Sequence, residues 1–174
     1  MKGPYLEKNL QTGLAALAEL AGQVDWFDLR KDDLQVFFPQ LAERTYYIGR
    51  WHLLGRDPLI IGDSGHNLAG LTGTLQAIEQ MPFERLHLVL GFTAEKDIQK
   101  MLAILPTTAS YYFCKADVPK GLDAQRLQSR AAAFDLKGAA YASVESALAA
   151  AKQAASPADL IFVGGSIFVL AEVL

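Results

Sequence analysis

Cysteine, basic charge and long hydrophobic runs are all scarce in this sequence. Its 174 residues include one cysteine, Cys114, which excludes an intrachain disulfide framework and most cysteine metal sites. The formal net charge is −3, whereas a general nucleic-acid-binding protein needs a basic surface. The apolar runs are far shorter than the roughly 18–20 residues of a membrane span, and charged residues occupy the N-terminal stretch where a signal peptide would be apolar. We therefore expect a cytoplasmic protein with no membrane and no nucleic-acid partner.

Common phosphate-binding and metal-binding patterns are missing as well. The sequence contains neither Gly-x-Gly-x-x-Gly, the dinucleotide fingerprint, nor the Gly-Lys-Ser/Thr of a P-loop. Its three histidines are scattered and do not have the spacing of metal ligands. No Ser-His-Asp set can be argued, because no serine lies in a nucleophile elbow.

Short apolar runs alternate with helical patterns from residue 51 onward. Hydrophobic residues make up 51% of the chain and charged residues 20%, which is a globular composition. Two helices are expected before this region, at 6–21 and 32–44, and Pro39 should break or kink the second. The other expected elements are strands at 51–54, 59–61, 86–90, 110–113, 139–141 and 160–163, and helices at 67–80, 97–105, 123–134, 144–155 and 166–174.

This alternation predicts an α/β fold with a mainly parallel, Rossmann-like sheet flanked by helices and an antiparallel strand near the start. The strands are continuously apolar, as strands are when helices cover both faces of a sheet. We divide the chain into a helical entry segment, 1–45, and an α/β domain, 46–174. Ligands bind such sheets beyond the carboxyl ends of the strands, so the strand-to-helix junctions are the places to look for a site.

The strongest candidate junction follows the strand at 59–61. Asp63, His66 and Asn67 place a carboxylate, an imidazole and an amide within five positions. Asp63 could accept a hydrogen bond from a ribose hydroxyl or hold a metal-bound water. His66 and Asn67 could orient a polar substrate group at the helix N-terminus, where backbone N–H groups favour anions. The alternative is that Asp63 or Ser64 caps the helix and His66 is solvated, and the residues alone leave both interpretations open.

Two further junctions are weaker by themselves. Gly164, Gly165 and Ser166 follow the last strand, where the glycines would let a ligand approach the backbone and Ser166 could bind a carboxylate. Lys96 and Asp97 stand at the start of the helix at 97–105, where Lys96 could meet a phosphate. At both junctions, a simple helix cap is the favoured interpretation of the motif taken alone.

Four motifs taken together and in this order resemble a known family. They are Ile48-Gly49-Arg50, Asp63-Ser64-Gly65-His66-Asn67, Lys96-Asp97 and Gly165-Ser166. The resemblance is to the C-terminal domain of folylpolyglutamate synthases and bifunctional dihydrofolate synthases, which are relatives of the Mur ligases of peptidoglycan synthesis. That family carries Pro-Gly-Arg, Asp-Gly-Ala-His-Asn, Lys-Asp and Gly-Ser at these places. Here Ile48 replaces the proline, Ser64-Gly65 replaces Gly-Ala, and Leu68 replaces the proline that usually follows the asparagine.

The N-terminal part is similar to the same family. Residues 3–9 resemble a Gly-x-Tyr-Gln-x-x-Asn segment that opens an alanine-rich helix, with Leu6 in place of the glutamine. Pro119-Lys120 resembles a family Pro-Arg. The resemblance covers nearly the whole chain. It implies a Mur ligase C-terminal domain for residues 46–174 and the end of the ATPase-domain region for residues 1–45.

The resemblance also implies a reaction. The family's enzymes are ATP-dependent ligases that add L-glutamate to folate through an acyl phosphate, and whether dihydropteroate is also a substrate stays open. ATP and Mg²⁺ are the implied cofactors. The P-loop, the main Mg²⁺ ligands and a carbamylated lysine belong to the family's N-terminal ATPase domain, which has no counterpart in this sequence. We therefore expect that domain as a partner, and we expect this chain alone to be inactive.

Each candidate side chain receives an implied role by the same resemblance. Asn9 would contact the adenine, Arg50 the phosphates, and Asp63 the nucleotide from this domain's side. His66 and Ser166 would place the incoming glutamate. Supporting roles fall to Asn67, Lys96 and Asp97, and none of these residues would be a metal ligand or act directly in catalysis.

Two other functions remain open at this point. The chain could be a free-standing α/β module that binds a nucleotide or a protein without catalysis. It could also be part of a Mur-type ligase that acts on a peptidoglycan precursor. The Asp-x-x-His-Asn motif and the tyrosine-containing N-terminal segment favour the folate branch.

Overall fold

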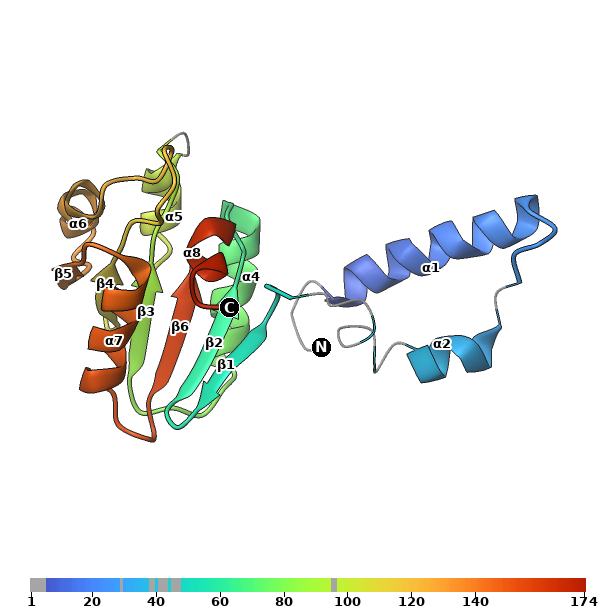
Figure 1. Cartoon of the computed structure of the whole chain (residues 1–174), viewed down its shortest axis with the longest axis horizontal. Helices are drawn as coiled ribbons and strands as arrows, with labels where there is room; N and C mark the ends of the chain where they lie inside the picture. The colour runs from blue at the N-terminus through green and yellow to red at the C-terminus, as the bar shows by residue number, and fades with distance from the viewer. Residues whose placement is uncertain (1–5, 29, 38–39, 41–43, 45–47, 95–96) are drawn as a thin grey trace. The chain divides into compact units, whose positions relative to one another are not determined.

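The computed structural model describes residues 6–28, 30–37, 40, 44, 48–94 and 97–174. Its contacts divide the chain into two compact units, Met1–Ile48 and Gly49–Leu174. The first unit contains the helices α1 (Leu6–Gln23) and α2 (Lys31–Phe37). The second unit contains the sheet and the other helices that the structure describes (Figure 1).

The second unit alternates strands and helices in chain order, as the sequence predicts. Its strands are β1 (His52–Arg56), β2 (Leu59–Asp63), β3 (Leu86–Leu90), β4 (Ser110–Phe113), β5 (Gly138–Ala140) and β6 (Leu160–Gly164). Its helices are α4 (Leu68–Glu79), α5 (Ile98–Leu102), α6 (Ala124–Ala132), α7 (Val144–Ala154) and α8 (Ile167–Ala171).

The six strands form one sheet in the order β1-β2-β6-β3-β4-β5. Only β1 and β2 pair in antiparallel fashion, and every other neighbouring pair is parallel. The last strand, β6, lies between β2 and β3, so the connection from β2 through α4 to β3 passes over it. The predicted fold, a mainly parallel sheet with an antiparallel strand at its start, is confirmed.

Helices cover both faces of the sheet (Figure 1). Side chains that alternate along the strands pack into two separate hydrophobic cores, one on each face. On one face α4, α5 and α6 pack against side chains that include Leu88 and Phe162. On the other face α7 and α8 pack against side chains that include Val89 and Val163. All of these side chains are buried, which is why the strands read as continuous apolar runs.

Some predicted element boundaries were wrong. The turn between the first two strands consists of Asp57 and Pro58 alone, because Gly55 and Arg56 continue β1. Asp63 is the last residue of β2 rather than part of the following loop. The helices expected at 97–105 and 166–174 are shorter, at Ile98–Leu102 and Ile167–Ala171. Beyond the helices, the Leu105 N–H donates to the Leu102 carbonyl and the Val173 N–H donates to the Leu170 carbonyl, three residues back, while their side chains pack against the core. Leu174 remains 51% exposed, so the apolar periodicity overestimates the helix length.

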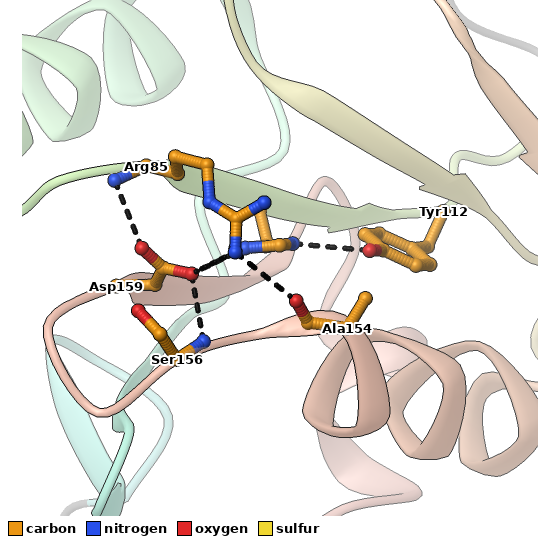
Figure 2. Close-up of polar contacts among 6 residues, drawn as sticks. Arg85, Tyr112, Ala154, Ser156 and Asp159 are labelled. Carbon is orange, nitrogen blue, oxygen red and sulfur yellow. Dashed lines mark hydrogen bonds and ion pairs between the residues drawn. The ribbon is translucent and has the colours of Figure 1, made fainter.

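A buried carboxylate joins the chain segments at the amino edge of the sheet (Figure 2). Asp159, just before β6, accepts hydrogen bonds from the Arg85 guanidinium at 2.9 Å and the Ser156 backbone at 2.8 Å. His87 on β3 lies between Asp159, at 3.2 Å, and the Tyr112 hydroxyl, at 3.0 Å. Burial alone would raise the pKa of Asp159, but hydrogen bonds from Ser156, Arg85 and His87 outweigh it and hold the pKa well below its usual range. This cluster ties α7 and β6 to β3 and β4.

The first unit differs from the second in having no core of its own among the described residues. The apolar side chains along α1, Leu10, Leu14, Leu17 and Ala21, are all only partly buried. Leu20 remains 40% exposed and Trp26 remains 83% exposed. A helix of this kind gains most of its stability in proteins from packing its apolar face, so this unit needs a surface to cover it.

Candidate functional site at the carboxyl edge of the sheet

Two of the predicted junctions meet at the carboxyl edge of the sheet. Asp63 pairs with Gly164 in the parallel register of β2 and β6, and Gly164 pairs with Leu90 on β3. The loops after β2, β6 and β3 therefore leave the sheet side by side at the same level. The connection from β2 to β3 passes over β6 in one direction along the sheet, and the connection from β5 to β6 returns in the other. Open α/β sheets bind ligands at such a reversal.

Asp63 lies at the end of β2, beside the end of β6, and its side chain is completely buried. Its Oδ2 accepts a hydrogen bond from the Trp51 backbone N–H at 2.9 Å, and its Oδ1 accepts one from the Gly65 N–H at 2.7 Å. The Arg50 guanidinium lies 3.6 Å from Oδ1. One carboxylate thus fixes the segment before β1 and the loop after β2 in a common arrangement.

The backbone that carries Arg50 is shaped to meet this carboxylate. Gly49 has φ of 90° and Trp51 has φ of 45°, two left-handed conformations on either side of Arg50. The Ser64 N–H also donates to the Gly49 carbonyl at 2.9 Å. A left-handed conformation is uncommon for a bulky residue such as tryptophan, and the hydrogen bond from Trp51 to Asp63 holds it there.

His66 and Asn67 lie on the exposed side of the loop after β2. The Nδ1 of His66 is 3.1 Å from the Ser64 carbonyl, which can only accept, so the neutral ring carries its proton on Nδ1 and has Nε2 as its acceptor. Asn67 is the N-cap of α4, and its side chain accepts from the Gly70 N–H at 2.8 Å. The simpler interpretation placed the cap on Asp63 or Ser64, and that assignment was wrong.

A depression of about 420 Å³ lies beside this loop. Its lining combines the two junctions after β2 and β3 and consists of His66, Asn67, Leu68, Asp97, Lys100 and Met101. Asp97 stands at the start of α5 without capping it through its side chain, and its carboxylate pairs with Lys100 at 3.1 Å. Lys100 was not singled out in the sequence, although its position three residues after Asp97 on a helix was a usable signal.

Ser166 lies on the same edge but faces inward. It is the N-cap of α8, its hydroxyl oxygen accepts from the Phe168 N–H at 3.3 Å, and only 3% of the residue is exposed. The preceding Gly165 has φ of 86°, and a Cβ there would lie 2.7 Å from the Gly91 carbonyl oxygen. The serine cap that the motif favoured on its own is confirmed, and the close approach of backbone explains the glycine.

For two predicted residues the structure gives no position relative to this edge. Asn9 is exposed on α1, in the first unit. Lys96 lies outside the residues that the structure describes. The edge therefore brings together Arg50, Asp63 and the loop with His66 and Asn67, and adds Asp97 and Ser166 from the neighbouring junctions.

Cys114 directly follows β4 on the same edge and is completely buried. Burial, with a smaller effect of the Glu172 carboxylate, raises the pKa of its thiol to about 12. The thiol therefore stays protonated at neutral pH and has the inert character of a small apolar side chain.

The chemistry of the edge is that of a binding surface. It offers a partly exposed guanidinium, an imidazole, a lysine and backbone groups, with a buried carboxylate behind them. Within the described ranges, no group of three or more His, Cys, Asp or Glu side chains could hold a metal ion. These residues therefore do not fit a metal site of their own. The fold is a doubly wound α/β domain, and this edge is its candidate ligand surface.

The comparisons with known proteins identify the family. Residues 49–167 match the family described as Mur ligase, glutamate ligase domain, and the chain belongs to that family. A probable bifunctional folylpolyglutamate synthase/dihydropteroate synthase from Haloferax volcanii is 34% identical over 132 residues, which cover 74% of this chain and 15% of that protein.

Solved structures show the same likeness. FolC from E. coli in complex with DHPP and ADP is 28% identical with a TM-score of 0.66, over 72% of this chain and 30% of that one. A bifunctional folylpolyglutamate synthase/dihydrofolate synthase with Mn, AMPPNP and L-glutamate bound is 26% identical with a TM-score of 0.66, over 73% of this chain and 30% of that one. The chain thus spans less than a third of the length of each of these three proteins.

Among the helices that the structure describes, none combines the length and the apolar character needed to cross a bilayer.

Proposed function

We propose that this chain works as the C-terminal portion of an ATP-dependent ligase that adds L-glutamate to folate. The observation that carries the proposal is the family match over residues 49–167, with the Asp63 to Asn67 motif lying at the carboxyl edge of the sheet. The names of the relatives, which are folylpolyglutamate synthases, and the nucleotide and L-glutamate bound in one of the solved structures support it.

The proposed reaction couples amide formation to ATP. A folate carboxylate oxygen attacks the γ-phosphorus of ATP, the bond to ADP breaks, and an acyl phosphate forms. The amine of L-glutamate then attacks the acyl carbon, loses a proton, and displaces inorganic phosphate as the amide forms. Because the phosphoryl steps need little covalent chemistry from the protein, the task of this domain is to position groups and neutralise charge.

The residues at the edge suit those tasks in different ways. Arg50 presents a fixed positive charge and a planar fork, which suit phosphate oxygens, and its side chain is 31% exposed. Asp63 serves the nucleotide side by holding Arg50 and Trp51 in place, since its carboxylate is already occupied and fully buried. Asn9 would reach the adenine from the first unit.

The glutamate is assigned to the loop after β2 and its neighbours. The exposed ring of His66 would contact the incoming amino acid, with Asn67 and Asp97 shaping the depression beside it. Ser166 would act through the turn that it caps, because its hydroxyl is buried. Lys96 stays a candidate for the same surface, on the strength of the sequence motif.

The missing partner would be the N-terminal ATPase domain of the same enzyme. Two observations support this: the chain spans only 15% of the Haloferax volcanii protein and 30% of the E. coli one, and the described part of the first unit has no buried side chain. The partly exposed apolar face of α1 would pack against that domain. Mg²⁺ would be held mainly there, as the family resemblance implies.

The test compares the turnover of this chain alone with its turnover when it is joined to an ATPase domain. Coupled ADP-release assays with folate, L-glutamate and Mg-ATP should show no turnover for this chain alone, and turnover when it is joined to an ATPase domain of a folate ligase. In the active enzyme, Arg50→Ala should lower turnover by roughly 10–150-fold, as expected for a lost charged hydrogen bond to phosphate, and Arg50→Lys should recover part of it. Turnover by the chain alone, or an unaffected Arg50→Ala enzyme, would overturn the proposal. ATP or protein binding without any ligation would favour a free-standing module.

A further inference from the structure

The loop between β4 and α6, residues 114–123, runs across the carboxyl edge and contacts two other junctions. On one side it pairs with the loop after β3. The Ala94 N–H donates to the Lys120 carbonyl at 2.9 Å, the Leu122 N–H donates to the Phe92 carbonyl at 2.8 Å, and Thr93 forms an antiparallel bridge with Gly121. These bonds fix the backbone of Phe92, Thr93 and Ala94 after β3.

On its other side the same loop contacts α8. The ammonium of Lys120 lies 5.3 Å from the centre of the Phe168 ring, within the range of a cation–π interaction. The Asp117 N–H donates to the Glu172 carboxylate at 2.6 Å, just beyond the end of α8. The loop is thus joined to the beginning of α8 through a side chain and to its end through the backbone.

Among the loop residues named above, Lys120 is the one that contacts both the loop after β3 and α8. Its carbonyl holds the loop after β3, and its ammonium covers the ring of Phe168, whose own N–H donates to the Ser166 hydroxyl at 3.3 Å. We propose that Lys120 is a positioning residue that holds the loop after β3 and the start of α8 in one arrangement, so that Asp97 and the turn that Ser166 caps keep a fixed relation to each other. The inference deepens the proposed function, since it takes this edge as the ligand surface.

The charge of Lys120 is the feature that matters in this arrangement. The side chain is exposed, so burial of its methylenes contributes little, whereas the attraction to the ring quadrupole needs a cation. Arginine would keep that attraction and methionine would keep only the bulk. Lys115 provides a matched control, because it is an exposed lysine of the same loop that lines a separate depression with Tyr141.

Amide exchange and NMR shifts of this chain test the proposal without any assay of activity. In Lys120→Met, the Phe168 N–H should exchange about twofold to fivefold faster, and the amide signal of Ala94 should shift, with the melting temperature nearly unchanged. Lys120→Arg should restore both, and Lys115→Met should change neither. Unchanged Phe168 and Ala94 amides in Lys120→Met, or equal changes in Lys115→Met, would overturn the positioning role.

A second arm distinguishes this inference from the proposed function. In a reconstituted enzyme, Lys120→Met should raise the KM for L-glutamate more than it lowers kcat, because it disturbs the presentation of binding groups and not the phosphoryl chemistry. If kcat falls and KM stays constant, the positioning role is overturned. If no reconstitution gives turnover while the amide results hold, the proposed ligase function fails and the role of Lys120 stands.

Discussion

The guanidinium of Arg50 lies 3.6 Å from the carboxylate of Asp63, a side chain that is itself completely buried. The two residues come from different elements, one from the segment before β1 and the other from the end of β2. The same carboxylate accepts hydrogen bonds from Trp51 and Gly65. Asp63 therefore organises the edge from behind, and Arg50 is the charged group that this arrangement presents.

Replacing Asp63 should destabilise both the carboxyl edge of the sheet and the fold as a whole. In Asp63→Asn one oxygen becomes an NH₂ group that faces N–H donors, and the buried partner of Arg50 is lost. We expect a loss of roughly 2–4 kcal/mol in the free energy of unfolding, measured by urea denaturation. Asp97→Asn, at an exposed carboxylate on the same edge, should stay within about 0.5 kcal/mol. Equal losses in the two variants would contradict the central role of Asp63.

Asp159 should make the protein sensitive to acid. Because its pKa in the folded state is held below the unfolded value of about 4, its stabilising contribution is fully present above that pH. The contribution is lost progressively as the pH falls through the folded pKa. The stability gap between the wild type and Asp159→Asn should thus be largest near pH 7 and should shrink below about pH 4.

Urea unfolding at a series of pH values measures that gap directly. The control is Asp135→Asn, at an exposed position with φ of 57° that asparagine tolerates. Its gap to the wild type should be small throughout. A gap for Asp159→Asn that stays constant from pH 7 to pH 3 would show that the carboxylate is not stabilised in its charged form.

Thr74 offers a stabilising substitution. It is fully buried in α4, and its hydroxyl has no hydrogen-bond partner among the described residues. Thr74→Val keeps the shape and removes the unpaired hydroxyl, so we expect a gain of about 1 kcal/mol in a thermal or urea melt. The control is Thr72→Val, because the Thr72 hydroxyl donates to the Leu68 carbonyl at 2.8 Å. If both variants gain equally, helix propensity and not the orphan hydroxyl is responsible.

Gly165 should not tolerate a side chain. Its φ of 86° is strained for any other residue, and an added Cβ would meet the Gly91 carbonyl at 2.7 Å. We expect Gly165→Ala to lower the stability of residues 49–174 by at least about 2 kcal/mol, as followed by urea denaturation. Gly13→Ala on α1, where nothing lies within 4 Å, should leave that transition unchanged. If Gly165→Ala changed the stability as little as Gly13→Ala does, the turn at Gly165 would be able to relax around the added methyl group.

The strands were the easiest elements to predict, for a clear reason. Those at 86–90 and 110–113 match their predicted bounds, because an apolar run between polar turns has only one way to be buried on both faces. Asp63 was harder to predict, since a charged residue is rarely part of a buried strand, and its contacts with Trp51, Gly65 and Arg50 make that position favourable. Asn67 became the cap of α4 because the preceding residues were already engaged with the strand end.

The sequence by itself determined the fold class, the family resemblance and the junctions that carry the candidate site. These features depend on local periodicity and on motifs that are contiguous in the chain. Only the tertiary structure decided that Ser166 faces inward, that Lys120 joins two loops, and that Asp159 gathers His87 and Arg85 at the opposite edge. Such contacts join residues up to 74 positions apart, and their geometry follows from strand order and register, which the local pattern does not encode.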